Sequence, residues 1–357
     1  MTMAIATVAL AACGGGPARA PSTSTATTPP PRVLAARPAL CNRLHAAVSG
    51  HVTAPAATEL SGLALSRTQP RVLWTHNDSG DRARVLAVTA TGRLLADIAV
   101  TGAANVDWEE IALGPAAAGG DALYIADTGD NDARRREVVV YRVPEPRVRG
   151  GGPAATAPAA RLVLRYPDGP HDAEALLVDA GTGALVLVTK SFDGDAGIYV
   201  AVRPAAARAT MLRRRGRQSL GGGEAITGAS VSADGHTIVL RTYDRALVWT
   251  RRPREALARA LRRRPCTARA DLLAEGQGEA ITLTDDGRAF YTVPEGRRPA
   301  IRRYGRVAAR LRRLSDHNAG STTFRSPSRD FGSGPYPPPP SNSLGTRPVR
   351  PRRARFV

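Results

Sequence analysis

One short pattern recurs five times along this 357-residue chain and constrains its fold more than any other feature. Each copy has an acidic or hydroxyl residue, then a small or acidic residue, then leucine or isoleucine. The copies begin at Ser61, Glu109, Glu174, Glu224 and Glu279, at spacings of 48, 65, 50 and 55 residues. Such a period is typical of architectures in which each repeat is one structural unit that packs against its neighbours.

The residues that follow the repeated pattern predict short antiparallel strands. Residues 178–188 and 232–240 each contain a Thr-Gly or Asp-Gly pair next to an apolar run, which is a hairpin signal. A unit of about fifty residues with several short strands has the size of one β-propeller blade. We therefore predict an all-β protein, a β-propeller of about six blades of antiparallel strands over residues 39–315. The sixth blade would combine residues 295–315 with a strand around 41–58.

In this fold, acidic residues from several repeats meet at one mouth of the central channel. The first strand of each blade lines the channel, and the second strand returns to the same face. The residues expected where second strands end include Asp78, Asp127, Asp130, Lys190, Arg241 and Glu295. Converging carboxylates repel one another unless a cation lies among them, and oxygen ligands favour Ca²⁺. The alternative is that these are ordinary turn residues around a hydrated acidic mouth.

Two basic residues, Lys190 and Arg241, have nearly the same register as Asp127 in neighbouring units. Beside a bound cation they would hold a phosphate or carboxylate ligand. The alternative for each is a salt bridge to an adjacent glutamate.

Four runs of residues resemble a known group of proteins. They are Glu-Leu-Ser-Gly-Leu at 59–63, Leu-Trp-Thr-His-Asn-Asp-Ser-Gly-Asp at 73–81, Asp-Trp-Glu-Glu-Ile-Ala at 107–112 and Tyr-Ile-Ala-Asp-Thr-Gly-Asp-Asn at 124–131. Over residues 55–300 the chain resembles the phytase-like and SdiA-regulated β-propellers of bacterial envelopes. Phytase-like enzymes bind calcium through mouth carboxylates and hydrolyse phosphoesters. The resemblance implies metal ligands at Glu109, Asp127, Asp130, Glu174, Glu224 and Glu279, and ligand-binding residues at Asp78, Lys190 and Arg241.

The N-terminus resembles the lipobox of bacterial lipoproteins, since a short apolar run ends in small residues directly before Cys13. The resemblance implies a signal segment over residues 1–13, a lipid on the Cys13 thiol and a flexible tether over residues 14–38. The protein would then lie at the outer face of the cytoplasmic membrane. No Lys or Arg precedes the apolar run, although a secretory signal carries such residues. The alternative is an apolar, disordered N-terminus with a chance cysteine.

The two other cysteines, Cys41 and Cys266, would tend to form a disulfide in an oxidising compartment. Such a bond would join the start of the folded region to its late part. Two lone buried thiols are the alternative.

The net charge of +19 is concentrated near the C-terminus, where residues 297–357 hold fifteen arginines against Asp316 and Asp330. Residues 316–357 are rich in Pro, Ser, Arg and Gly, and a segment of this composition cannot bury a core. We expect a disordered tail there. Aromatic residues make up 4% of the chain and do not alternate with basic stripes, so a nucleic-acid partner is not expected.

Two functions fit these features. The first is a lipid-anchored envelope protein that binds a small molecule or a protein partner at its acidic mouth without chemistry. The second is a calcium-dependent hydrolase of phosphoesters or lactones, in which the cation polarises the ester and acidifies a water. The sequence contains no nucleophile elbow, phosphate-binding Gly-Lys-Ser loop or paired-cysteine zinc motif, so no catalytic residue is assigned.

Overall fold

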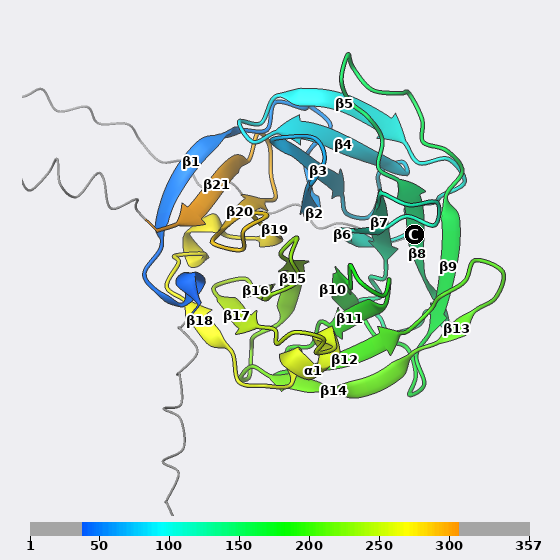
Figure 1. Cartoon of the computed structure of the whole chain (residues 1–357), viewed down its shortest axis with the longest axis vertical. Helices are drawn as coiled ribbons and strands as arrows, with labels where there is room; N and C mark the ends of the chain where they lie inside the picture. Colours follow the sequence, from blue (N-terminus) through cyan, green and yellow to red (C-terminus); the bar gives the residue numbers. More distant parts are fainter. Residues whose placement is uncertain (1–37, 307–357) are drawn as a thin grey trace, which may run out of the picture. The chain divides into compact units, whose positions relative to one another are not determined.

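The computed structural model describes residues 38–306, which form five antiparallel sheets around one axis, the blades of a β-propeller (Figure 1). Blade 1 contains β2 (Leu60–Leu65), β3 (Val72–Asn77), β4 (Arg84–Thr89) and β5 (Leu94–Ala99). Blade 2 contains β6 (Trp108–Pro115), β7 (Asp121–Asp127), β8 (Val138–Pro144), β9 (Ala160–Arg165) and the short parallel β13 (Thr210–Met211). Blade 3 contains β10 (Ala173–Val178), β11 (Leu185–Thr189), β12 (Asp195–Ala201) and β14 (Arg213–Ser219). Blade 4 contains β15 (Ile226–Val231), β16 (Thr237–Thr242), β17 (Ala246–Thr250) and β18 (Cys266–Ala268). Blade 5 contains β19 (Gly278–Leu283), β20 (Ala289–Pro294), β21 (Ala300–Gly305) and β1 (His45–His51).

The hydrophobic core is divided among the interfaces between adjacent blades. Five clusters of buried apolar side chains fill these interfaces, one cluster to each interface. Between blades 1 and 2, for example, Trp74 of β3 packs in the same cluster as Trp108 of β6. Inner strands are therefore covered on both faces, which explains why β10 and β19 are buried at every position.

The ring closes by combining both ends of the described chain in blade 5. Strand β1 pairs antiparallel with β21, with His45 opposite Gly305. The prediction of about six blades is wrong, because residues 45–51 and 300–305 complete the sheet of β19 and β20 and do not form a sheet of their own. Next to this closure, a disulfide joins Cys41 to Cys266 across 225 residues of sequence, with the two Cα atoms 5.7 Å apart.

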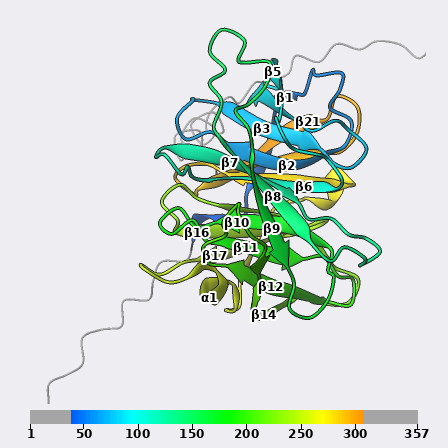
Figure 2. The same cartoon turned by 90° about the vertical axis from the view of Figure 1, so that its right-hand side faces the viewer.

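A long loop between β8 and β9, residues 145–159, extends from blade 2 over the outer strand of blade 1 (Figures 1 and 2). Ala155 in this loop forms a parallel bridge with Ala99 of β5. The side chain of Gln69 donates to the Pro146 carbonyl at 2.9 Å and accepts from the Val148 amide at 2.9 Å. This loop accounts for the 65-residue interval between two copies of the repeat.

Several predictions concern residues outside the described range. The lipid site at Cys13, the tether up to residue 37 and the tail at 316–357 all lie there. The helices of residues 38–306 are η1 (Ala39–Cys41), α1 (Leu257–Leu261) and η2 (Leu273–Glu275). None of these is long and apolar enough to cross a bilayer.

Candidate metal centre at the propeller mouth

Each inner strand contains a register irregularity, a β-bulge, at the same end of the ring. A bulge leaves one residue unpaired and redirects its side chain. From blade 1 to blade 5 the bulges contain Ser61, Glu109, Glu174, Thr227 and Glu279. The residues directly after the second strands reach the same end, and they are Asp78, Thr128, Lys190, Tyr243 and Glu295. Together these two sets form the mouth of the propeller.

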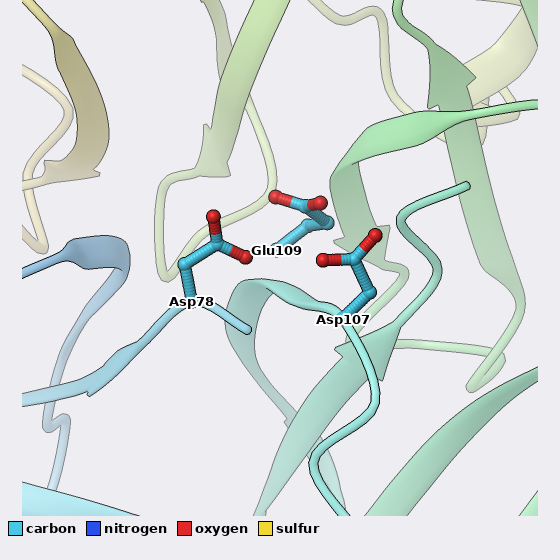
Figure 3. A group of neighbouring side chains, drawn as sticks. All are labelled: Asp78, Asp107 and Glu109. Atoms are coloured by element: carbon cyan, nitrogen blue, oxygen red, sulfur yellow. The ribbon is translucent and has the colours of Figure 1, made fainter. Parts of the chain in front are cut away.

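Carboxylates from three blades meet at this mouth in two overlapping groups. Asp78, Asp107 and Glu109 form the first acidic trio, in which one oxygen of each residue lies within 4.8 Å of the others (Figure 3). Glu109, Asp172 and Glu174 form the second acidic trio by the same distance. Glu109 belongs to both trios and therefore lies between two candidate cation positions.

The carboxylates of the trios are in an environment that opposes their ionisation. Glu109 and Glu174 are each only 2% exposed. Burial raises the pKa of Glu109 well above its usual range, and repulsion from Glu174 and Asp78 raises it further. Burial, followed by repulsion from Asp78 and Asp172, raises the pKa of Asp107 to about 6. A bound cation would offset this repulsion.

Two buried carboxylate oxygens at the mouth have no hydrogen-bond partner within residues 38–306. They are Oε2 of Glu174 and Oε2 of Glu279. A buried acceptor without a partner costs about 1–3 kcal/mol, and more if it is charged. This is the arrangement that a hard cation with oxygen ligands would satisfy.

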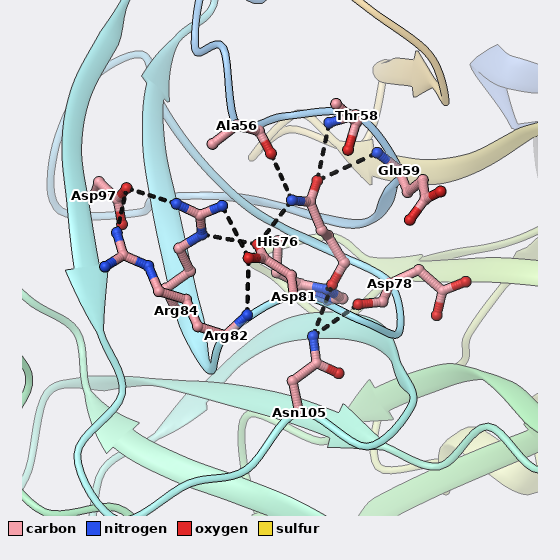
Figure 4. A network of polar contacts seen from close by, with 11 residues as sticks. Ala56, Thr58, Glu59, His76, Asp78, Asp81, Arg82, Arg84, Asp97 and Asn105 are labelled. Atoms are coloured by element: carbon pink, nitrogen blue, oxygen red, sulfur yellow. Dashed lines mark hydrogen bonds and ion pairs between the residues drawn. The ribbon is translucent and has the colours of Figure 1, made fainter.

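The backbone around Asp78 is held in place by a network of hydrogen bonds (Figure 4). The side-chain oxygen of Asn77 accepts from the amides of Thr58 at 3.1 Å and Glu59 at 3.3 Å. The side-chain nitrogen of Asn77 donates to the Ala56 carbonyl at 2.6 Å. From blade 2, Asn105 donates to the Asp78 carbonyl at 2.7 Å. The loop that carries Asp78 is thus fixed on both sides before any ligand binds.

The predicted ligands Asp127 and Asp130 support the trios and are members of neither. Asp127 Oδ1 accepts from the Asp107 amide at 3.2 Å and pairs with Arg135 at 2.8 Å. The carboxylate of Asp130 accepts from the Arg135 amide at 2.7 Å, while the Asp130 amide donates to Asp172 Oδ1 at 2.9 Å. Asp127 and Asp130 are therefore occupied by these bonds, through which they orient Asp107 and Asp172.

Gly129 lies against the carboxylates of the first trio. A Cβ atom at this position would lie 2.1 Å from Glu109 Oε1 and 2.4 Å from Asp107 Oδ2. Glycine at this position therefore lets the two carboxylates approach the backbone closely.

Lys190 and Tyr243 continue the polar surface of the mouth toward blade 5. The Lys190 ammonium contacts Glu174 Oε1 and lies 6.0 Å from the centre of the Tyr243 ring. The Tyr243 hydroxyl donates to Glu279 Oε1 at 3.3 Å. Burial disfavours the charged ammonium, but attraction to Glu174 outweighs this and raises the pKa of Lys190. Lys190 therefore remains a cation at neutral pH, in the salt bridge that the sequence offered as the alternative to a ligand contact.

Below the trios, the channel is closed by Glu110, which is only 1% exposed. Its Oε1 accepts from the amides of Ile111 at 3.0 Å and Leu63 at 3.4 Å. Its Oε2 accepts from the Ala229 amide of blade 4 at 2.7 Å. A cavity of about 30 Å³ between the inner strands lies beyond it. Glu110 therefore links three blades across the channel beneath the trios.

Besides Asp127 and Asp130, the predicted metal ligands Glu279 and Glu224 belong to neither trio, and the predicted ligand-binding residue Arg241 lies away from them. Glu224 precedes β15, forms an ion pair with Arg245 and belongs to neither trio, because Thr227 occupies the bulge of blade 4. Arg241 is fully buried inside β16 and does not face the mouth. Its guanidinium pairs with Glu275 Oε2 at 2.9 Å and donates to the Ala280 carbonyl at 3.1 Å, in space that Gly278 leaves open. Arg241 thus joins blades 4 and 5 and is closed to a ligand.

Asp107 and Asp172 were not predicted, although the sequence contains a signal for them. Each stands two residues before a bulge glutamate, so that Asp-x-Glu occurs at 107–109 and again at 172–174. In both blades the aspartate precedes the strand and the glutamate occupies its bulge, which brings both carboxylates to the mouth.

Similarity to known proteins is found among solved structures and is distant. No family model and no curated protein sequence matches this chain. Among solved structures, a gluconolactonase from Xanthomonas campestris shares 14% identity over 73% of this chain and 89% of its own, with a TM-score of 0.43. The β-propeller domain of Swd1 from Myceliophteria thermophila shares 11% identity over 74% of this chain and 100% of its own, with a TM-score of 0.37. A putative 6-phosphogluconolactonase from Bacteroides uniformis shares 15% identity over 70% and 67%, with a TM-score of 0.37.

Proposed function

We propose that this propeller binds Ca²⁺ at the two acidic trios and, next to it, an anionic ligand. The observation that carries the proposal is the position of Glu109, a buried carboxylate shared by two groups whose oxygens lie within 4.8 Å. The unsatisfied Oε2 of Glu174 in the second trio supports it. A carboxylate with two oxygens can serve two cations at once.

The donor set favours calcium over softer metals. All five members of the trios offer carboxylate oxygens, and neither trio contains histidine or cysteine. The nearby His76 is completely buried with its ring edge-on to Trp108, and burial lowers its pKa to about 4.

The ligand class follows from the donors beside the second trio. The Lys190 ammonium contacts Glu174, and the Tyr243 hydroxyl donates to Glu279. These groups would bind oxygens of a phosphate or a carboxylate that also contacts the cation. With a neutral ligand, Glu174 would be the only negatively charged partner of the Lys190 ammonium at this site.

Isothermal titration of the metal-free full-length protein with Ca²⁺ tests the proposal. Glu109→Gln should abolish binding, because both trios lose a shared charged ligand. Glu224→Gln is the matched control, since it removes a carboxylate near the mouth that belongs to neither trio, and it should bind calcium like the wild type. Unchanged calcium binding by Glu109→Gln would contradict the proposal.

Hydrolysis of phosphoesters or lactones is a second candidate function, favoured by the same cationic and hydroxyl donors beside the trios. The resemblance to phytase-like propellers supports this candidate. A bound cation would polarise the ester and lower the pKa of a water. Turnover of a phosphoester or lactone that requires calcium and falls strongly in Lys190→Met would support it. Calcium binding without turnover of either substrate class leaves ligand binding as the function.

The location we propose is the outer face of the cytoplasmic membrane, with a lipid on Cys13. The apolar run and small residues before Cys13 support this location. Fractionation of cells tests it: the wild type should be in the membrane fraction and Cys13→Ser should be released. A soluble wild type with an intact N-terminus would refute the anchor.

A further inference from the structure

A second charged surface lies on the outer side of blades 3 and 4, away from the mouth. It is a groove of about 830 Å³ between strands β11 and β12, the start of β14 and the segment around α1. Seven arginines line it: Arg215, Arg251, Arg252, Arg254, Arg259, Arg262 and Arg263. We call it the arginine groove.

Most of this positive charge is not neutralised within residues 38–306. The two acidic residues of the groove are already engaged, Asp179 with Arg251 at 2.5 Å and Glu255 with Arg263 at 2.9 Å. The other five arginines are all exposed and have no acidic partner in the described part of the chain. Arg259 of α1 and Arg262, the residue directly after this helix, are three positions apart, a spacing at which like charges repel each other.

The floor of the arginine groove is aliphatic. Val186, Val200, Val202 and Leu257 line it, and Val202 is 45% exposed. Exposed apolar surface rimmed by polar groups marks interaction sites. A partner for this groove therefore needs negative charges along its edges and aliphatic side chains toward its centre.

We propose that the arginine groove binds an acidic peptide segment that contains aliphatic residues. Single-stranded nucleic acid fits less well, because no aromatic side chain lines the groove for base stacking. A membrane surface fits less well because the surface is concave. The C-terminal segment of this chain has the wrong charge, since residues 307–357 contain many arginines and only Asp316 and Asp330 as acids.

Arg254 can be replaced to test the arginine groove with little risk of unfolding the protein. Its φ is 61°, a left-handed conformation that glycine adopts without strain. Arg254→Gly therefore removes a guanidinium while relieving the backbone, so loss of folding is not expected. The test variant combines Arg254→Gly with Arg262→Gln. The matched control combines Arg136→Gln with Arg161→Gln, two exposed arginines of blade 2 without acidic partners in residues 38–306.

The experiment measures fluorescence anisotropy of a labelled peptide of alternating Glu and Leu with the full-length protein, at about 0.15 M salt to screen weak contacts. The groove variant should raise Kd about tenfold, and the control should stay close to the wild type. The same peptide with Ser in place of Leu should bind more weakly. Equal losses in both variants would overturn the proposal. So would tighter binding of an oligonucleotide or of phosphatidylglycerol vesicles of matched charge.

Discussion

Replacing Gly129 with alanine separates the geometry of the trios from their charge. The added Cβ would lie 2.1 Å from Glu109 Oε1 and 2.4 Å from Asp107 Oδ2, so these carboxylates must move by about 1 Å to reach ordinary contact distances. Calcium ligands lie within a range of about 0.3 Å, from ~2.3 to ~2.6 Å from the ion. A displacement of about 1 Å therefore exceeds what a calcium site tolerates, although every carboxylate is still present.

The assay is a melting curve with and without calcium. At about a hundredfold excess over Kd, one site contributes about 2.7 kcal/mol to the wild type. This amounts to a Tm increase of about 5 °C in a domain of this size. Gly129→Ala should lose this increase, while its calcium-free Tm stays near that of the wild type, since φ at Gly129 is not in the left-handed region.

Gly222→Ala is the control for this experiment. A Cβ at Gly222 meets nothing within 4 Å in the described structure, and its φ is also outside the left-handed region. This variant should keep the full calcium-dependent increase in Tm. If Gly129→Ala shows the same increase as Gly222→Ala, the carboxylates next to Gly129 do not hold the cation.

Three further predictions concern the pH dependence, the disulfide and the closed channel. Burial, followed by repulsion from neighbouring carboxylates, raises the pKa of Glu109 and Asp107 in the folded state. Their contribution to the stability of the calcium-free protein is therefore fully present below the unfolded pKa, and it is lost as the pH rises through the folded pKa. Calcium-free Tm should therefore fall from about pH 5 to about pH 8, with a smaller fall in Glu109→Gln; an equal fall in both proteins would refute this. Replacing both Cys41 and Cys266 with alanine should lower the free energy of unfolding by about 2–5 kcal/mol in urea titrations, and an unchanged midpoint would show that the bond adds no stability. Glu110→Gln should lower the free energy of unfolding by about 1–3 kcal/mol. The two Glu110 oxygens accept from three backbone amides, and glutamine replaces one of these oxygens with an NH₂ group that cannot accept. Equal stability of the two proteins would mean that Glu110 is protonated in the native protein.

The sequence predicts the class of fold because the repeat coincides with the inner strands. It predicts the number of blades less well, since a repeat does not reveal that β21 and β1 share a sheet with β19 and β20. Pairing of residues about 250 positions apart depends on the whole ring, and no local pattern records it.

The sequence predicted the site residues that occupy equivalent positions in their strands. It failed where the position of a residue relative to its strand differs by a few residues from one blade to the next. Glu109, Glu174 and Glu279 occupy bulges of equivalent strands, whereas Glu224 precedes β15 and Thr227 occupies the bulge of that strand. Arg241 lies inside β16, one position before the end of the strand, whereas Lys190 follows β11. Arg241 is thus equivalent to Val188 of β11, whose side chain is buried between blades, whereas Lys190 lies beyond the end of its strand and reaches the mouth.

Strand β1 has a consequence for the order in which the protein folds. It is among the first described residues to be synthesised, but its partner β21 is among the last, so β1 must wait while four complete blades form. A waiting strand with two free edges is exposed to pairing with other chains. The sequence of β1, His-Ala-Ala-Val-Ser-Gly-His, has a single large apolar residue, Val48, and this side chain is still 57% exposed in the closed ring. Because β1 buries so little, it remains compatible with water during the delay and closes the ring through backbone hydrogen bonds once β21 has emerged.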